Sequence, residues 1–299
     1  MRALALCLAM CSLCTVLASC APHTKTRVSP STGPRIISLA PSLTEIAFAI
    51  GCGNRLVADT VFDDYPAASR TLPHVADTRT ANLELVAALK PTTVVALHDQ
   101  ELEGSPIARQ LGIPVLYLPN RDLGDLNADI EGVGRACSRT TQAAALARSL
   151  DRRIAAIADA ARAKRRPRVL YLLGLPGFAA GRHSFLGDMI EAAGGENVAA
   201  SSGEPYPDLN AEAIVRADPD IIVVAADTPF DKDVQAQMPW RALRAVRDGA
   251  VLRPPSDDIM ERNGPRIVDG LAWLHTALAH RSYNRSYNEG ADARRPSHS

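Results

Sequence analysis

The sequence predicts an α/β fold of two βα lobes with parallel sheets, joined by one long helix, with a ligand cleft between the lobes. Short β-branched runs alternate with amphipathic segments, which is typical of a parallel sheet covered on both faces. The order of these segments occurs twice. Residues 142–166 separate the two copies and stop before Pro167. This segment has one narrow apolar stripe at helical spacing, formed by Leu146, Leu150, Ile154, Ile157 and Ala161.

The domain organisation follows from this pattern. Residues 35–141 are predicted to form the N-terminal lobe, 142–166 the linking helix and 167–280 the C-terminal lobe. The alternative for 142–166 is an ordinary surface helix inside one domain. The polar tail 281–299, which contains RSYN twice, is predicted to be disordered.

In the N-terminal lobe, RIISLA at 35–40 predicts a buried strand. Ser42, with Glu45 three residues later, forms a capping-box pattern for a helix that Gly51 ends. A strand at 55–60 precedes a polar, irregular stretch at 61–81, which is long enough to suggest a function. The remaining predicted elements are helices at 82–90, 105–112 and 122–136 and strands at 92–97 and 114–119.

The C-terminal lobe repeats this arrangement. Its predicted strands lie at 168–174, 220–226 and 251–252, and its helices lie at 185–193, 210–217, within 229–249 and at 264–280. At an offset of 128 residues, Asn82 matches Asn210 and Glu84 matches Glu212. The two halves therefore contain an internal repeat.

Composition limits the function. The 299 residues are 46% hydrophobic, enough for a sizeable core. Lys+Arg and Asp+Glu each total 33, so a nucleic-acid partner is disfavoured.

The first residues predict export. Arg2 precedes an apolar run at 3–18, as in a signal peptide, here predicted to span 1–19. LASC, ending at Cys20, resembles the lipobox of bacterial lipoproteins, which implies that Cys20 is lipidated and that 20–34 forms a tether to the membrane. A plain secretory signal is the alternative, and both place the protein in the periplasm or cell envelope. The choice between inner and outer membrane stays open.

Apart from Cys20, the cysteines beyond the predicted signal peptide are Cys52 and Cys137. In an oxidising envelope they can form a disulfide, but two cysteines do not define a framework, so two free thiols remain an alternative.

Catalytic motifs are missing from the sequence. Beyond the predicted signal peptide, it contains no Gly-rich phosphate loop, GxSxG, HExxH or CxxC, and its histidines have no metal-ligand spacing. We therefore expect no enzyme activity, no cofactor and no metal site. An exported α/β enzyme that uses the interlobe cleft is the alternative.

Candidate ligand-binding residues follow the predicted strands. In an open α/β sheet, ligands bind beyond the carboxyl ends of the strands. The loops there contain aromatic faces and cationic groups suited to a large, partly anionic ligand: Phe62, Tyr65, Arg79, Phe178, Arg182, His183 and Tyr206. Glu84 and Glu212 occupy the first turns of equivalent helices, where an acid also complements the helix dipole.

Several segments together resemble one family. RIISLAPSLTEIAFAIG, DDYP, NLELVAALKPTTVVAL, SFLGDMIEAAGGENVA and RNGPRIVDGLAWL resemble the helical-backbone substrate-binding proteins of ABC importers for vitamin B12, iron-siderophores and haem. The resemblance covers residues 35–280. It implies a monomer with two rigid lobes, little hinge closure and a ligand between the lobes. It also implies that Glu84 and Glu212 pair with arginines of the membrane permease.

The spacing is most similar to the cobalamin-binding members of this family. Phe62 and Tyr206 match aromatic positions around the corrin, whereas other such positions are Thr78, Leu97, Leu173 and Ile259. Asp77 stands where haem-binding relatives have a tyrosine ligand, which argues against haem bound in that way. Arg79, Arg182 and Arg262 suit the acidic groups of a siderophore. The predicted ligand-binding residues are Phe62, Tyr65, Arg79, Arg182, Tyr206 and Arg262.

The sequence thus predicts an extracytoplasmic substrate-binding lipoprotein of an ABC importer, which captures a corrinoid and delivers it to the permease and its ATPase. A ferric siderophore is the alternative ligand. A lipoprotein that passes its ligand to other proteins without a permease is a further alternative.

Overall fold

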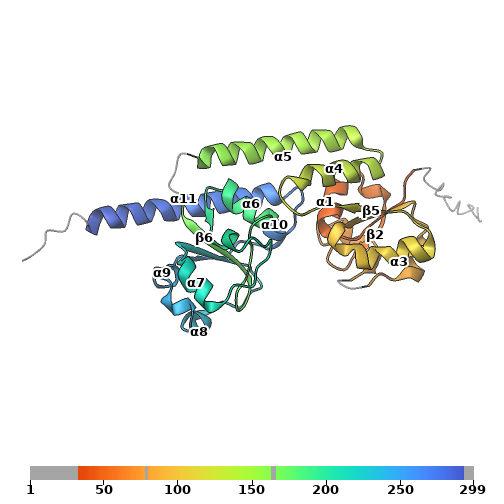
Figure 1. Ribbon diagram of the computed structural model, residues 1–299. Coiled ribbons are helices and arrows are strands. Elements are labelled where there is room, and N and C mark those ends of the chain that lie inside the picture. Colours follow the sequence, from red (N-terminus) through yellow and green to blue (C-terminus); the bar gives the residue numbers. More distant parts are fainter. Residues whose placement is uncertain (1–32, 78–79, 163–165, 293–299) are drawn as a thin grey trace, which may run out of the picture. The chain divides into compact units, whose positions relative to one another are not determined.

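The computed structural model describes residues 33–77, 80–162 and 166–292 (Figure 1). The compact unit described here begins at Pro34. The predicted signal peptide and Cys20 lie outside the described residues, as do residues 21–32 of the predicted tether. Among the described helices, none has the length and apolarity needed to cross a membrane.

The first sheet is fully parallel, with strand order β3-β2-β1-β4-β5. Its strands are β1 (Ile36–Ser38), β2 (Leu56–Thr60), β3 (His74–Ala76), β4 (Thr93–Leu97) and β5 (Val115–Leu118). Its helices are α1 (Pro41–Ala49), α2 (Leu83–Leu89), α3 (Glu101–Leu111) and α4 (Asp125–Ala136). Ile36 packs in the same buried cluster as residues of α1 and α4, whereas Ile37 packs with residues of α2 and α3. This alternation places helices on both faces of the sheet.

The second sheet has strand order β10-β9-β6-β7, and β8 also pairs with β6. Its strands are β6 (Arg168–Gly174), β7 (Phe178–Ala179), β8 (Glu196–Asn197), β9 (Ile221–Val224) and β10 (Val251–Leu252). Its helices are α6 (Phe185–Ala192), α7 (Ala211–Ala217), α8 (Lys232–Gln235), α9 (Arg244–Arg247), α10 (Asp258–Glu261) and α11 (Ile267–Asp292). The β6–β7 pair is antiparallel and the other pairs are parallel. The α/β fold with parallel sheets is confirmed, with short β7 as an addition.

The internal repeat is also a structural repeat. Asn82 accepts a hydrogen bond from the backbone N–H of Leu85 at 3.0 Å, and Asn210 accepts one from Ala213 at 2.8 Å. Helices α2 and α7 each have seven residues. Both end at a left-handed residue, with φ of 47° at Lys90 and 33° at Asp218. Matching caps and lengths give the two glutamates equivalent places in the first helical turn.

The long helix α5 (Thr140–Ala161) begins and ends earlier than the sequence predicts. Its predicted stripe faces the core, since Leu150 and Ala161 are buried and Leu146, Ile154 and Ile157 pack against the main cluster. The helix packs against α4 and α11.

That main cluster takes residues from both sheets. Ile36 and Val95 belong to the first sheet and Val169 and Tyr171 to the second, and Leu271 of α11 lies in the same cluster. A second cluster covers the other face of the second sheet. Because the apolar core is shared, separating the two sheets would expose buried surface to water.

Three local predictions were wrong. Helix α1 has Ala40 as its N-cap and Pro41 in its first turn, with no side-chain cap, so the capping box is absent. Proline suits this position because its missing N–H needs no partner there. The stretch predicted as irregular at 61–81 contains strand β3. Disorder was predicted from Arg281, but α11 continues to Asp292, and no proline interrupts it.

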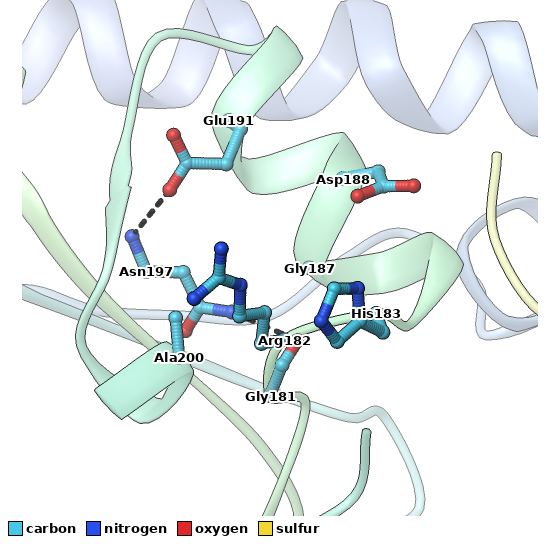
Figure 2. A pocket seen from close by; sticks show the side chains of 8 residues that line it. All are labelled: Gly181, Arg182, His183, Gly187, Asp188, Glu191, Asn197 and Ala200. Atoms are coloured by element: carbon cyan, nitrogen blue, oxygen red, sulfur yellow. Dashed lines mark hydrogen bonds between the residues drawn. The ribbon is translucent and has the colours of Figure 1, made fainter. Parts of the chain in front are cut away.

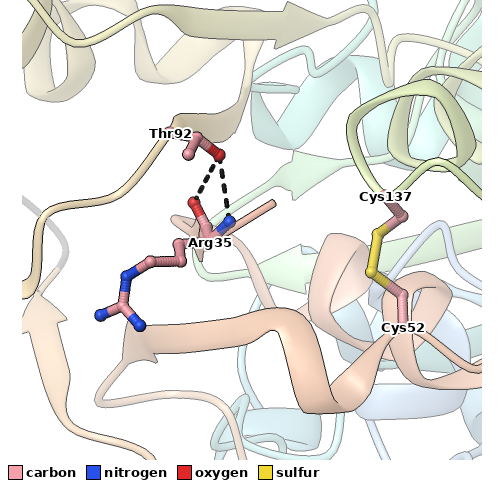
Figure 3. The surroundings of a disulfide bond; sticks show 4 residues. All are labelled: Arg35, Cys52, Thr92 and Cys137. Atoms are coloured by element: carbon pink, nitrogen blue, oxygen red, sulfur yellow. Dashed lines mark hydrogen bonds between the residues drawn. A yellow bond between two sulfur atoms is a disulfide. The ribbon is translucent and has the colours of Figure 1, made fainter. Parts of the chain in front are cut away.

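A disulfide joins Cys52 to Cys137, with Cα atoms 6.0 Å apart (Figure 3). Cys52 lies shortly after α1, beyond its cap Ile50 and Gly51, and Cys137 caps the end of α4. The bond therefore ties the two helices that cover one face of the first sheet.

We expect loss of this disulfide to destabilise the protein, because the bond closes a loop with a sequence separation of 85 residues. Replacing both cysteines by alanine should lower the free energy of unfolding by about 2–5 kcal/mol in urea titrations. The unfolding midpoint of reduced wild-type protein should shift towards that of the variant. Reductant should not change the midpoint of the variant itself. Equal midpoints for oxidised and reduced wild type would contradict the prediction.

Candidate functional site

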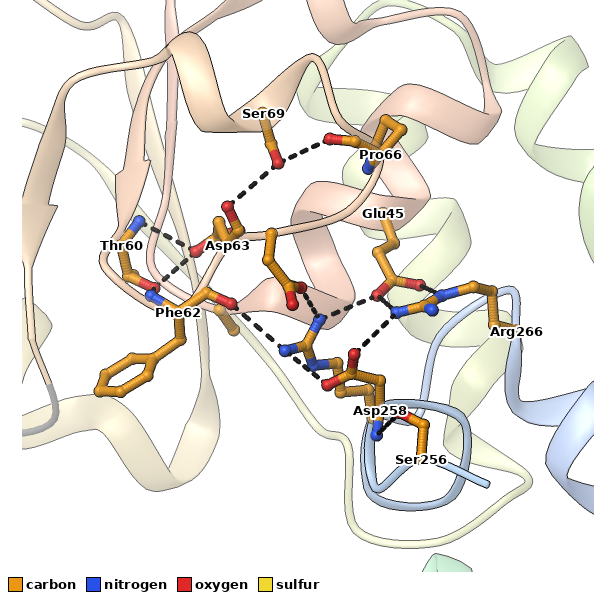
Figure 4. Close-up of polar contacts among 12 residues, drawn as sticks. Glu45, Thr60, Phe62, Asp63, Pro66, Ser69, Ser256, Asp258 and Arg266 are labelled. Carbon is orange, nitrogen blue, oxygen red and sulfur yellow. Dashed lines mark hydrogen bonds and ion pairs between the residues drawn. The ribbon is translucent and has the colours of Figure 1, made fainter. Parts of the chain in front are cut away.

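An exposed aromatic loop, residues 61–66, follows β2 at the carboxyl end of the first sheet. The Phe62 and Tyr65 side chains are 45% and 46% exposed. Figure 4 shows the Phe62 ring pointing away from the polar groups beneath it. Aromatic residues that are this exposed on a strand-end loop provide flat apolar faces for a ligand.

Asp63 holds this loop from below. Its buried carboxylate accepts hydrogen bonds from the Thr60 N–H at 2.9 Å and the Thr60 hydroxyl at 2.5 Å. The Ser69 hydroxyl donates to the Asp63 carbonyl at 3.1 Å. Burial raises the pKa of Asp63, and the hydrogen bonds from Thr60 oppose that rise.

Arg262 reaches the same loop from the C-terminal half of the chain. Its Nη1 lies 2.6 Å from Asp64 and 3.4 Å from Glu45, and its Nη2 lies 2.7 Å from Asp258. Nη2 also donates to the Phe62 carbonyl at 3.3 Å. Although burial favours a higher pKa for Asp64, the hydrogen bond and charge of Arg262 lower it.

Arg266 lies beside Arg262. Its Nε and Nη2 donate to the two carboxylate oxygens of Glu45 at 2.8 and 2.6 Å. The centre of its guanidinium is 4.0 Å from the centroid of the Tyr65 ring. The hydrogen bond that Arg266 donates to Glu45 raises the pKa of Arg266, while burial opposes the rise.

The second lobe presents another aromatic pair. The Phe178 and Tyr206 rings, 41% and 40% exposed, have centroids 6.2 Å apart. The segment carrying Tyr206 runs beside β7, where Leu209 donates to the Gly177 carbonyl at 2.9 Å. A Cβ at Gly177 would lie 1.9 Å from the Leu209 carbonyl, so only glycine allows this approach.

Two acidic groups act on Tyr206 of this second pair. Burial raises the pKa of Tyr206 to about 12, and the charges of Asp99 and Glu261 add to the rise. Burial, followed by the charges of Asp257 and Asp227, raises the pKa of Glu261 to about 7. Near neutral pH, Glu261 is therefore present both as an acceptor and as a protonated donor.

Arg182 lines a different place, a pocket of about 440 Å³ beside α6 (Figure 2). His183, Asp188 and Glu191 also line it, so positive and negative groups are mixed there. Asp188 accepts a hydrogen bond from the Leu123 N–H at 3.0 Å, and burial raises its pKa. The described residues that line this pocket do not include Phe62, Tyr65 or Tyr206.

The two predicted docking glutamates are exposed. Glu84 lies in the first turn of α2 and Glu212 in that of α7. Glu212 forms an ion pair with Arg216, which is also exposed.

The structure thus brings Phe62, Tyr65 and Arg262 together and separates them from Arg182. Arg79 lies outside the described residues. Sequence reasoning missed Glu45 and Arg266, since the pattern around Glu45 resembles a capping box. Within the described residues, no group of three or more His, Cys, Asp or Glu could hold a metal ion.

A family model described as "Periplasmic binding protein" matches residues 36–257. The vitamin B12-binding protein of Yersinia pestis (strain Pestoides F) is 30% identical over 237 residues, which are 78% of this chain and 82% of that protein. These relatives are named as binding proteins and not as enzymes, which agrees with the expected lack of enzyme activity.

Solved structures show the same similarity. The periplasmic vitamin B12-binding protein of Vibrio cholerae matches with a TM-score of 0.70 and 27% identity, over 83% of this chain and 98% of that one. The periplasmic heme-binding protein of a Roseiflexus species matches with a TM-score of 0.71 and 27% identity, over 84% and 99%. A protein of an Fe³⁺-hydroxamate transport system from Saccharomonospora viridis matches with a TM-score of 0.65 and 26% identity, over 82% and 93%. The chain therefore belongs to the periplasmic binding protein family, whose members work outside the cytoplasm.

Proposed function

We propose that this protein is the extracytoplasmic substrate-binding lipoprotein of an ABC importer and that it captures a corrinoid such as vitamin B12. The observation that carries the choice of ligand is the 30% identity to a vitamin B12-binding protein across 78% of the chain. The protein binds and delivers its ligand without changing it.

The chemistry of the aromatic residues supports a corrinoid. The edge of a corrinoid carries amide groups, which donate hydrogen bonds, whereas haem carries carboxylates. The charged groups that, after burial, raise the pKa of Tyr206 are Asp99 and Glu261, and both are acidic. Acidic groups accept hydrogen bonds from amides and repel carboxylates. Phe62, Tyr65 and Tyr206 are the proposed apolar contacts of the ligand.

An iron chelate is the second candidate. The similarity to the Saccharomonospora viridis protein of an Fe³⁺-hydroxamate transport system favours it. A hydroxamate complex has fewer anionic groups than a catecholate complex and would be less disfavoured by the acidic residues. Arg79 and Arg182 stay predicted ligand-binding residues for such a chelate.

The docking role of Glu84 and Glu212 is supported by their equivalence. A dipole effect at a helix N-terminus explains an acid in either helix. Two exposed acids on capped helices of equal length, one in each lobe, match a permease that contacts both lobes with arginines. The permease and its ATPase are thus the proposed partners.

Ligand titration tests the choice of cargo. Purified mature protein should bind cyanocobalamin and cobinamide in calorimetry, and more tightly than haemin or a ferric hydroxamate. Replacing Phe62 or Tyr206 by alanine should weaken corrinoid binding by about tenfold, because each ring covers part of the ligand. Val215→Ala, which changes a side chain of similar exposure (39%) on α7, is the matched control. Tighter binding of the ferric hydroxamate than of either corrinoid would contradict the proposed corrinoid and favour the iron chelate as ligand.

Charge reversal tests docking. Glu84→Lys and Glu212→Lys together should abolish ligand uptake by cells while purified protein binds ligand as before, since like charges would then face the permease. Glu131→Lys, a charge reversal of an acid 60% exposed on α4, should leave uptake intact. Uptake by the double variant at the wild-type rate would show that these acids do not dock.

Cell fractionation tests the anchor. The mature protein should stay with the membranes, and Cys20→Ser should release it into the soluble envelope fraction, because the acyl chains would be missing. Membrane association that is unchanged in Cys20→Ser would rule out lipidation at this residue.

A further inference from the structure

Two arginines from the end of the chain hold the aromatic loop in place. Arg262 follows α10 and Arg266 directly precedes α11, whereas the loop 61–66 follows β2. We infer that Arg262 and Arg266 are positioning residues, which set the orientation of Phe62 and Tyr65 towards the ligand. This inference rests on the proposed function, since it concerns how the loop meets its ligand.

Both terminal nitrogens of Arg262 are occupied by partners within the protein. These nitrogens carry four N–H groups. Nη1 meets Asp64 and Glu45, and Nη2 meets Asp258 and the Phe62 carbonyl. Its side chain is 18% exposed. A ligand would have to displace one of these partners, so Arg262 acts on the ligand through the loop.

Arg266 controls one ring directly. Its guanidinium is held edge-on by both oxygens of Glu45 and lies against the Tyr65 ring at 4.0 Å. A tyrosine that is 46% exposed would otherwise lose rotamer freedom when it binds a ligand. Because the Tyr65 ring already stacks on a fixed cation, it loses less rotamer freedom when the ligand binds. Preorganisation of this kind strengthens binding.

Glu45 is the group that fixes both arginines. Its side chain is 2% exposed, and it lies within 3.4 Å of Arg262 and 2.6 Å of Arg266. A carboxylate this buried needs cationic partners, so Glu45 holds both arginines beside it. In this position the two arginines also contact the aromatic loop 61–66. Lysine cannot replace Arg266 fully, because an ammonium lacks the planar fork and the flat face.

A double-mutant cycle separates positioning from general stability. We would measure the dissociation constant for cyanocobalamin by calorimetry after Arg266→Gln in three backgrounds: wild type, Tyr65→Phe and Tyr65→Leu. Tyr65→Phe keeps the ring and Tyr65→Leu removes it. Arg266→Gln should weaken binding roughly two- to fivefold in the first two backgrounds and less than twofold in Tyr65→Leu. The same loss in all three would overturn positioning through Tyr65.

Two further variants guard against misfolding. Arg266→Lys keeps the charge beside Glu45, and it should reproduce part of the affinity loss even if Arg266→Gln fails to fold. Arg153→Gln removes an arginine whose ion pair with Asp269 is about half exposed, and it is the matched control with unchanged affinity. Wild-type affinity in Arg266→Lys, together with misfolding of Arg266→Gln, would indicate a structural role and overturn the inference.

A measurement without ligand makes the two proposals distinguishable. Amide hydrogen exchange in residues 61–65 should be several-fold faster in Arg262→Gln and Arg266→Gln than in wild type and Arg153→Gln. Unchanged exchange in this loop would overturn the inference. If wild type binds neither corrinoid, haemin nor ferric hydroxamate, the proposed function fails, and exchange alone then decides whether the arginines position the loop.

Discussion

The candidate binding region depends on the ion pairs of the buried Glu45 carboxylate with Arg262 and Arg266. The charge of this carboxylate is removed from water, so it requires the two guanidiniums that face it. Those guanidiniums come from the C-terminal part of the chain, more than two hundred residues away in sequence. A network of ion pairs therefore joins α1, the loop after β2 and the start of α11.

The shared apolar core supports this contact. Residues from both sheets, α5 and α11 pack in one cluster, so moving one sheet against the other would break apolar packing as well as ion pairs. A binding protein built in this way responds to its ligand with small shifts. The limited hinge closure that the family resemblance implied stays a prediction, and the shared core gives a physical reason for it.

Local features could be predicted from the sequence, and distant pairings could not. The caps at Asn82 and Asn210 and the repeat of α2 and α7 were predictable, because a cap depends on residues three positions apart. The stripe of α5 was predictable from its spacing. Glu45 was misread because its neighbours satisfy a local motif, while its partner Arg266 adjoins it only after folding. Arg262 was recognised as important, but its many protein partners were invisible in the sequence.

The difference between the two aromatic groups bears on how the ligand is chosen. The Tyr65 ring stacks on Arg266, and Arg262 holds the Phe62 carbonyl and Asp64 of the same loop, so we propose that this loop provides shape. Phe178 lies in β7 and Tyr206 on the segment that pairs with it, and burial, with the charges of Asp99 and Glu261 adding to it, raises the pKa of Tyr206. Glu261, with a pKa of about 7, can donate or accept a hydrogen bond at neutral pH. Shape selection by the first lobe and acceptor chemistry in the second together favour a flat ligand with an amide-rich edge.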